Sequence, residues 1–196
     1  MKTDLYIDFD STIVNSDKAI ATIYNAHYKD FEGFVPAVWE DHENWAYKKM
    51  CPLIHVHEEE PAKTVLSYFN SSEFFEYLEF YEDAKSTIQE LVNKYNVIIC
   101  TSAFPMNASR KVLWIEEHLP EIDEIITIIN KSGNGYGKAR VPMMEEDAIF
   151  IDDHPKNLHS TKASKKYLFK LSDTDYNGDW DGDIVSSWKQ IGKLLL

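Results

Sequence analysis

Short apolar runs alternate with helical segments along most of this 196-residue chain, and this alternation restricts the possible folds more than any other feature. Runs suited to buried strands lie at residues 3–9, 97–100, 122–129, 148–151 and 167–171. Helical periodicity marks residues 83–95 and 107–118, and the final segment IVSSWKQIGKLLL is typical of a closing helix. Strands that alternate with helices predict an α/β fold, a Rossmann-like parallel sheet with helices on both faces.

Residues 15–78 break this alternation. They contain amphipathic helical pieces and no convincing buried strand. We therefore expect a small helical cap domain at 15–78, inserted after the first strand, and a core domain formed by residues 1–14 and 79–196.

Charge and composition restrict the partners. The net charge of −13 argues against binding to a nucleic-acid polymer or to an anionic membrane surface, which would need clustered lysine and arginine. No window approaches the ~20 apolar residues of a transmembrane helix, and the first residues, MKTDLYIDFD, do not resemble a signal peptide. Cys51 and Cys100 are too few for a disulfide framework or a zinc cage. We expect a cytoplasmic protein with a small-molecule partner, and the sequence makes no prediction of the oligomeric state.

Polar side chains follow several of the predicted strands at the point where each strand ends. The carboxyl ends of parallel strands lie at one edge of the sheet, where α/β folds bind their ligands. Two like-charged carboxylates side by side repel, so the pair needs a compensating role, such as a shared divalent cation or reaction centre. The alternative for a pair like Asp8 and Asp10 is a solvated turn after an edge strand. The residues at this edge are Asp8 and Asp10, Thr101 and Ser102, Asp152 and Asp153, with Lys131 and Lys138 after the 122–129 run.

These residue types together suit phosphoryl transfer. Asp8 could attack phosphorus and form an aspartyl-phosphate, which divides one difficult displacement into two easier ones. Asp10 could protonate the leaving alkoxide and later activate water. Thr101 or Ser102 could donate to a phosphoryl oxygen, and a lysine could neutralise the charge on the equatorial oxygens.

The same set of acids could bind Mg²⁺, which prefers oxygen ligands from one or two carboxylates, waters and a substrate phosphate. We expect Asp8, the backbone carbonyl of Asp10, and Asp152 to be ligands. Asp153 would hold a coordinated water.

The motifs resemble those of the haloacid dehalogenase superfamily. DFDST, then TS at 101–102, a lysine, and IDD at 151–153 are similar to its four-motif pattern. Within the superfamily the chain most resembles the 5′(3′)-deoxyribonucleotidase branch, through VIICTSA, SEFFEYLEFYEDAKSTIQEL and IFIDDHPKNL. This resemblance implies a Mg²⁺-dependent phosphatase of nucleoside monophosphates, with Asp8 as nucleophile, Asp10 as acid/base, and Asp152 and Asp153 at the metal.

Two positions depart from a simple match. Lys131 and Lys138 both could supply the third-motif lysine, and we prefer Lys138 because the helix-starting sequence ARVPMMEE follows it. In this branch aromatic cap residues stack on the base, and Trp45 and Phe75 are the candidates here. Each of the two could equally belong to the core of the cap.

Two alternatives stay open. The cap sets specificity, so the substrate could instead be a sugar phosphate or another small phosphomonoester. In the other alternative the chain is not an enzyme but a catalytically idle metal- or protein-binding module on the same fold. The complete set of acids argues against that reading, because an idle site has no need for buried like charges.

Overall fold

The computed structural model describes residues 2–44, 46–129, 147–171 and 179–196. The chain forms two compact units. The core unit contains the residues up to Val14 and the segments from Phe80 onwards, and the cap unit is Asn15–Glu79.

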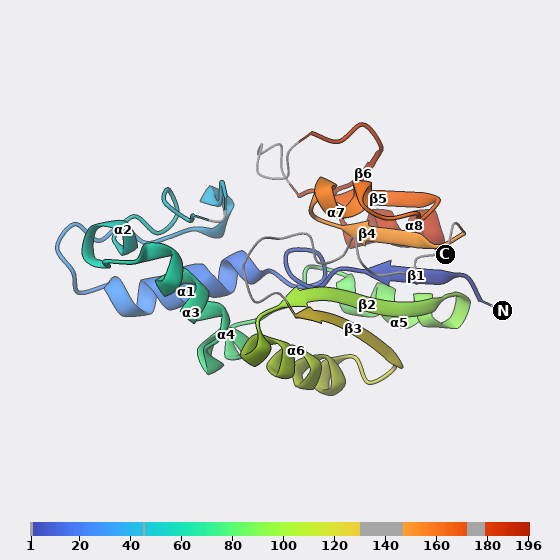
Figure 1. The fold of residues 1–196 in the computed structure, drawn as a ribbon, viewed down its shortest axis with the longest axis horizontal. Helices are drawn as coiled ribbons and strands as arrows, with labels where there is room; N and C mark the ends of the chain where they lie inside the picture. Colours follow the sequence, from blue (N-terminus) through green and yellow to red (C-terminus); the bar gives the residue numbers. More distant parts are fainter. Residues whose placement is uncertain (1, 45, 130–146, 172–178) are drawn as a thin grey trace. The chain divides into compact units, whose positions relative to one another are not determined.

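The core unit is built on a parallel sheet that has six strands among the described residues (Figure 1). The order across the sheet is β3-β2-β1-β4-β5-β6, and every neighbouring pair is parallel. This arrangement confirms the predicted Rossmann-like sheet. The strands are β1 (Asp4–Ile7), β2 (Asn96–Ala103), β3 (Glu124–Ile129), β4 (Ile149–Asp152), β5 (Lys165–Phe169) and β6 (Asp183–Val185).

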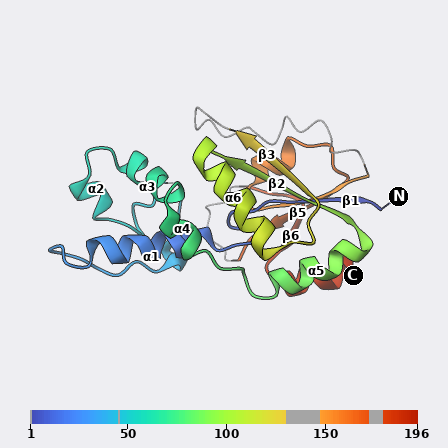
Figure 2. The same ribbon diagram turned by 90° about the horizontal axis from the view of Figure 1, so that it is seen from below.

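Helices cover both faces of the sheet, as the alternation predicts. On one face Leu158 of α7 joins a buried apolar cluster with Tyr6 and Phe150. On the other, α5 and α8 pack side by side (Figure 2), and Trp188 of α8 lies 6.3 Å from Phe169, measured between ring centroids. The helices of the core unit are α5 (Ala84–Lys94), α6 (Pro105–His118), α7 (Pro155–His159) and α8 (Trp188–Leu195).

The closing helix is shorter than the sequence predicts. Ile184 and Val185 belong to β6, and the helix begins at Trp188. The Ser187 side chain accepts a hydrogen bond from the backbone N–H of Gln190, which caps the helix at this point. A three-residue edge strand is too short to give a periodic signal, so its apolar residues resemble the first turn of the helix.

The cap unit is helical in its described residues. Its elements are α1 (Ser16–Tyr28), the 3₁₀ turn η1 (Trp39–Asp41), α2 (Ile54–His57), α3 (Pro61–Phe69) and α4 (Ser72–Glu76). Asn15 caps α1 by accepting a hydrogen bond from the backbone N–H of Lys18. Stacked and tilted aromatic pairs, such as Tyr24 on Tyr28 and Phe69 against Phe74, fill its interior. None of the helices described in either unit is long and apolar enough to cross a membrane.

Candidate active site

Three aspartates meet where β1 and β4 lie side by side. Asp8 directly follows β1, Asp152 ends β4, and Asp153 comes next. The backbone N–H of Asp8 donates to the carbonyl of Ile151 at 2.9 Å, which continues the pairing of the two strands up to the site. From β1 the next strands, β2 and β3, are added on one side, whereas β4, β5 and β6 lie on the other side. The border between β1 and β4 is therefore a topological switch point, where parallel α/β sheets bind their ligands.

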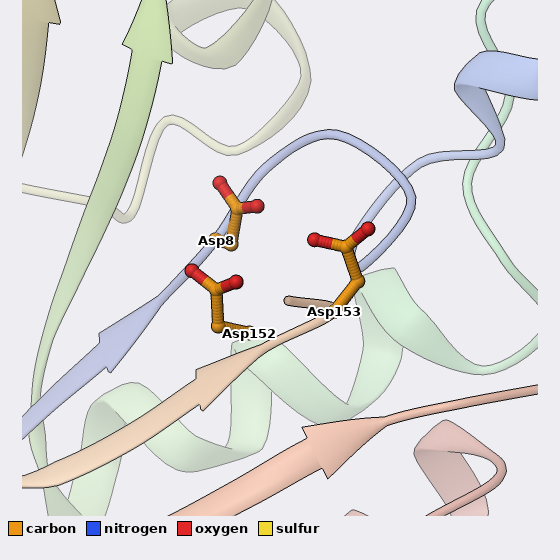
Figure 3. Close-up of side chains that lie close together, drawn as sticks. All are labelled: Asp8, Asp152 and Asp153. Carbon is orange, nitrogen blue, oxygen red and sulfur yellow. The ribbon is translucent and has the colours of Figure 1, made fainter. Parts of the chain in front are cut away.

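We call Asp8, Asp152 and Asp153 the acid cluster. One carboxylate oxygen from each lies within 4.8 Å of the others, and all three side chains are buried. Figure 3 shows the three carboxylates close together at the ends of their strands. Buried like charges at this separation disfavour the ionised state, whereas a divalent cation among them would favour it. Three convergent carboxylate oxygens are a donor set that fits Mg²⁺.

Protein groups hold these carboxylates in place. Asp152 accepts hydrogen bonds from the backbone N–H of His154 at 2.8 Å and from the Asn157 side-chain amide at 3.0 and 3.1 Å. The backbone N–H of Phe9 donates to the Asp8 carboxylate at 2.7 Å. Hydrogen bonds to the charged form stabilise it and fix its orientation, so the cluster is preorganised.

Asp10 stands on a tight loop after β1. The N–H of Ile13 donates to the carbonyl of Phe9 at 3.0 Å, and Ser11 adopts a left-handed φ of 52°. The indole N–H of Trp188 donates to the carbonyl of Thr12 at 2.8 Å, which ties the loop to α8. This loop leaves the side chain of Asp10 partly accessible, at 17% exposure.

Lys111, on α6, is the functional candidate that the sequence analysis missed. Its ammonium forms an ion pair with the Asp10 carboxylate and donates to Thr101 Oγ1 at 3.0 Å and to the Ser102 carbonyl at 3.1 Å. Only 1% of its side chain is exposed. The signal was present, because Lys111 lies on the same helix face as the buried Trp114 and Ile115, and a lysine among apolar stripe positions needs a partner.

Comparison with known proteins assigns the chain to a family. The model of the family 5′ nucleotidase, deoxy (pyrimidine), cytosolic type C protein (NT5C) matches residues 2–196. The chain belongs to this 5′ nucleotidase family. It is also 27% identical over 166 residues to a 5′(3′)-deoxyribonucleotidase of Clostridium acetobutylicum. The matched region covers 84% of this chain and 80% of the relative. The chain is therefore a phosphoric monoester hydrolase.

Solved structures show the haloacid dehalogenase fold. A haloacid dehalogenase-like hydrolase from Streptococcus pneumoniae has a TM-score of 0.64 at 15% identity, covering 100% of this chain and 99% of that one. A magnesium-bound hydrolase of the same superfamily from Bacillus subtilis has a TM-score of 0.66 at 11% identity, covering 99% and 98%. These likenesses confirm the superfamily fold that the four motifs suggest.

Of the other site residues predicted for this nucleotidase, some lie at the site, one lies in the cap, and some fall outside the described residues. Thr101 is fully buried near the carboxyl end of β2 and contacts Lys111, as described above. Phe75, in α4, is half-buried and meets Phe74 edge-on, with the ring centroids 5.2 Å apart. Lys131, Lys138 and Trp45 lie outside the described residues.

Proposed function

We propose that this nucleotidase is a Mg²⁺-dependent phosphatase of deoxyribonucleoside monophosphates that works through an aspartyl-phosphate. The observation that carries the proposal is the acid cluster at the switch point of the sheet, with Asp10 on the adjoining loop and Thr101 on the neighbouring strand. The family match and the Clostridium relative support the substrate class.

In the first step Asp8 attacks phosphorus. A bond forms between its carboxylate oxygen and phosphorus while the bond from phosphorus to the nucleoside oxygen breaks. The proton on the Asp10 carboxyl passes to that leaving oxygen, so the nucleoside departs as a neutral alcohol. The product of the step is a phosphoryl group on Asp8.

The second step returns the enzyme to its starting state. Asp10, now a carboxylate, accepts a proton from a water molecule as the water oxygen attacks phosphorus. The bond from phosphorus to Asp8 breaks, and inorganic phosphate leaves. Thr101 is placed on the strand next to Asp8, where a hydroxyl could orient a phosphoryl oxygen.

Asp8, Asp152 and Asp153 would hold the metal, together with the Asp10 backbone carbonyl. A bound Mg²⁺ would supply positive charge beside the transferring phosphoryl group and allow the acids to remain ionised together. Its presence would let a carboxylate nucleophile approach an anionic substrate in a protein whose net charge is −13.

Substrate specificity belongs to the cap in this proposal. Trp45 and Phe75 stay the predicted base-stacking residues, with the core of the cap as the other possibility for each. A sugar phosphate or another small phosphomonoester is the second candidate substrate, since the same chemistry at Asp8 would serve it.

A substrate panel tests the proposal. Phosphate release is measured from 5′- and 3′-deoxyribonucleotides, ribonucleotides and sugar phosphates, with Mg²⁺ and with a chelator. We expect Mg²⁺-dependent release, fastest from deoxyribonucleotides and lost in Asp8→Asn. Asp147→Asn is the matched control, because Asp147 is an exposed acid just before the amino end of β4. Fastest release from sugar phosphates would overturn the substrate, and full activity in Asp8→Asn would overturn the mechanism.

A further inference from the structure

The contacts of Lys111 account for all its hydrogen-bonding capacity. A lysine ammonium has three N–H donors. Three protein oxygens lie around it, one each from Asp10, Thr101 and the Ser102 carbonyl. A phosphate oxygen would have to displace one of these acceptors to bind the ammonium. This geometry favours a role within the protein over a direct role in phosphate binding.

The exposure of the Asp10 and Lys111 side chains also favours a role of the lysine within the protein. The side chain of Asp10 is 17% exposed, whereas that of Lys111 is 1% exposed. The ring of Phe9 covers the ammonium further, with its centroid 5.5 Å from Nζ. A leaving group can therefore reach the Asp10 carboxylate more readily than it can reach the lysine behind it.

Lys111 also connects two parts of the sheet edge. Asp10 belongs to the loop after β1, while Thr101 and Ser102 are in β2. A partly exposed carboxylate has several rotamers available, and proton transfer requires one of them. An ion pair with a buried lysine, itself fixed to β2, selects that rotamer.

We propose that Lys111 is a positioning residue that fixes the Asp10 carboxyl for proton transfer to the leaving group. This inference rests on the proposed function, since Asp10 is the acid/base there. Lys111 acts through Asp10 and touches neither the substrate nor the reacting atoms.

Leaving-group dependence tests the inference. The kcat/KM for a phosphatase of this type covers the steps up to formation of the phosphoenzyme, in which the leaving group departs. An alkoxide needs a proton from Asp10, whereas p-nitrophenolate needs almost none. We expect Lys111→Met to lower kcat/KM by about 10²-fold for the alkyl phosphate that the wild type hydrolyses fastest, and by less than about tenfold for p-nitrophenyl phosphate.

Double variants test whether Lys111 acts through Asp10. If Lys111 acts through Asp10, adding Lys111→Met to Asp10→Asn should cost less than about threefold further, because the two changes remove one function. Lys111→Arg, which keeps the charge and donors, should recover part of the activity on the alkyl phosphate. Lys189→Met, an exposed lysine on α8, controls for the change in net charge.

Equal losses on both substrates, together with weaker inhibition by inorganic phosphate, would overturn the inference and place Lys111 at the phosphate. Additive losses in the double variant would also overturn it. Because the alkyl phosphate is chosen by wild-type activity, an error in the nucleotide assignment would show in the substrate panel and would leave this test intact.

Discussion

The two units bury acidic side chains in opposite ways. In the core unit the acid cluster brings carboxylate oxygens of Asp8, Asp152 and Asp153 within 4.8 Å of one another. In the cap unit the buried Asp17 is surrounded by donors instead. Tyr47 OH donates to one of its oxygens at 2.9 Å, and His42 Nδ1 lies 2.9 Å from the other.

The second arrangement, which we call the cap cluster (Asp17, His42 and Tyr47), is typical of a structural network. The rings of His42 and Tyr47 stack with their centroids 4.4 Å apart, and His42 Nε2 lies 3.0 Å from the Asn44 carbonyl. A carboxylate paired in this way stabilises the fold, whereas like charges held together do not. Burial of an acid therefore indicates function only when its neighbours are considered.

The largest effect that would test this comparison is on activity. Asp8→Asn should reduce kcat by at least about 10³-fold, because it removes the attacking oxygen. The same change removes a charge from the acid cluster, so the metal-free protein should unfold at the same or a higher urea concentration than the wild type. Steady-state kinetics and urea unfolding monitored by circular dichroism measure the two quantities. A large loss of stability would mean that the acid cluster is structural.

The opposite outcome is expected in the cap. Asp17→Ala should lower the free energy of unfolding by about 3 kcal/mol, because the donors of His42 and Tyr47 lose a buried acceptor. Asp30→Ala, which removes an exposed acid from the same unit, is the control and should stay within ~0.5 kcal/mol. Urea unfolding of both variants checks this, and equal values for the two would contradict a structural role for the cap cluster.

Mg²⁺ should stabilise the folded protein only by binding to the acid cluster. Mg²⁺ at a hundred times its dissociation constant should add about 2.7 kcal/mol to the free energy of unfolding. Thermal melts with Mg²⁺ or with a chelator measure this as a rise in Tm. The rise should disappear in Asp152→Asn and persist in Asp17→Ala. A rise that survives Asp152→Asn would place the cation elsewhere.

The prediction with the smallest consequence for the comparison concerns Cys51, in the cap beside Asp17. Burial, and to a lesser degree the charge of Asp17, raise the pKa of the Cys51 thiol to about 12. At pH 8 roughly one thiol in 10⁴ is then ionised, so iodoacetamide should label Cys51 far more slowly in the native protein than in urea. Mass spectrometry of the labelled peptide measures this. Rapid labelling of the native protein would show that the packing around Cys51 opens readily.

The sequence allowed much of the core to be predicted, because its signals are local. The alternation of runs predicts the parallel sheet, and residues at strand ends, such as Asp8 and Asp152, converge once that sheet forms. Strand β6 was not predicted, because three residues are too few to show the alternating pattern of a strand. Asp17 and Tyr47 meet across 30 positions of the chain, and no local pattern predicts such a contact.

Lys111 lies between these cases. Its helix was predicted, but helical periodicity assigns charged residues to the solvent face by default. Its positions three and four residues before the buried Trp114 and Ile115 are the local signs that it points inward. The partner that makes its burial tolerable, Asp10, is 101 positions away.

The central claim is that Asp8 carries the phosphoryl group. Borohydride reduces an aspartyl-phosphate to homoserine, and peptide mapping locates the product. The wild type, quenched during turnover of a deoxyribonucleoside monophosphate with Mg²⁺, should contain homoserine at position 8 and nowhere else. Modification at Asp10, Asp152 or Asp153 instead, or an unmodified chain under rapid turnover, would contradict the account.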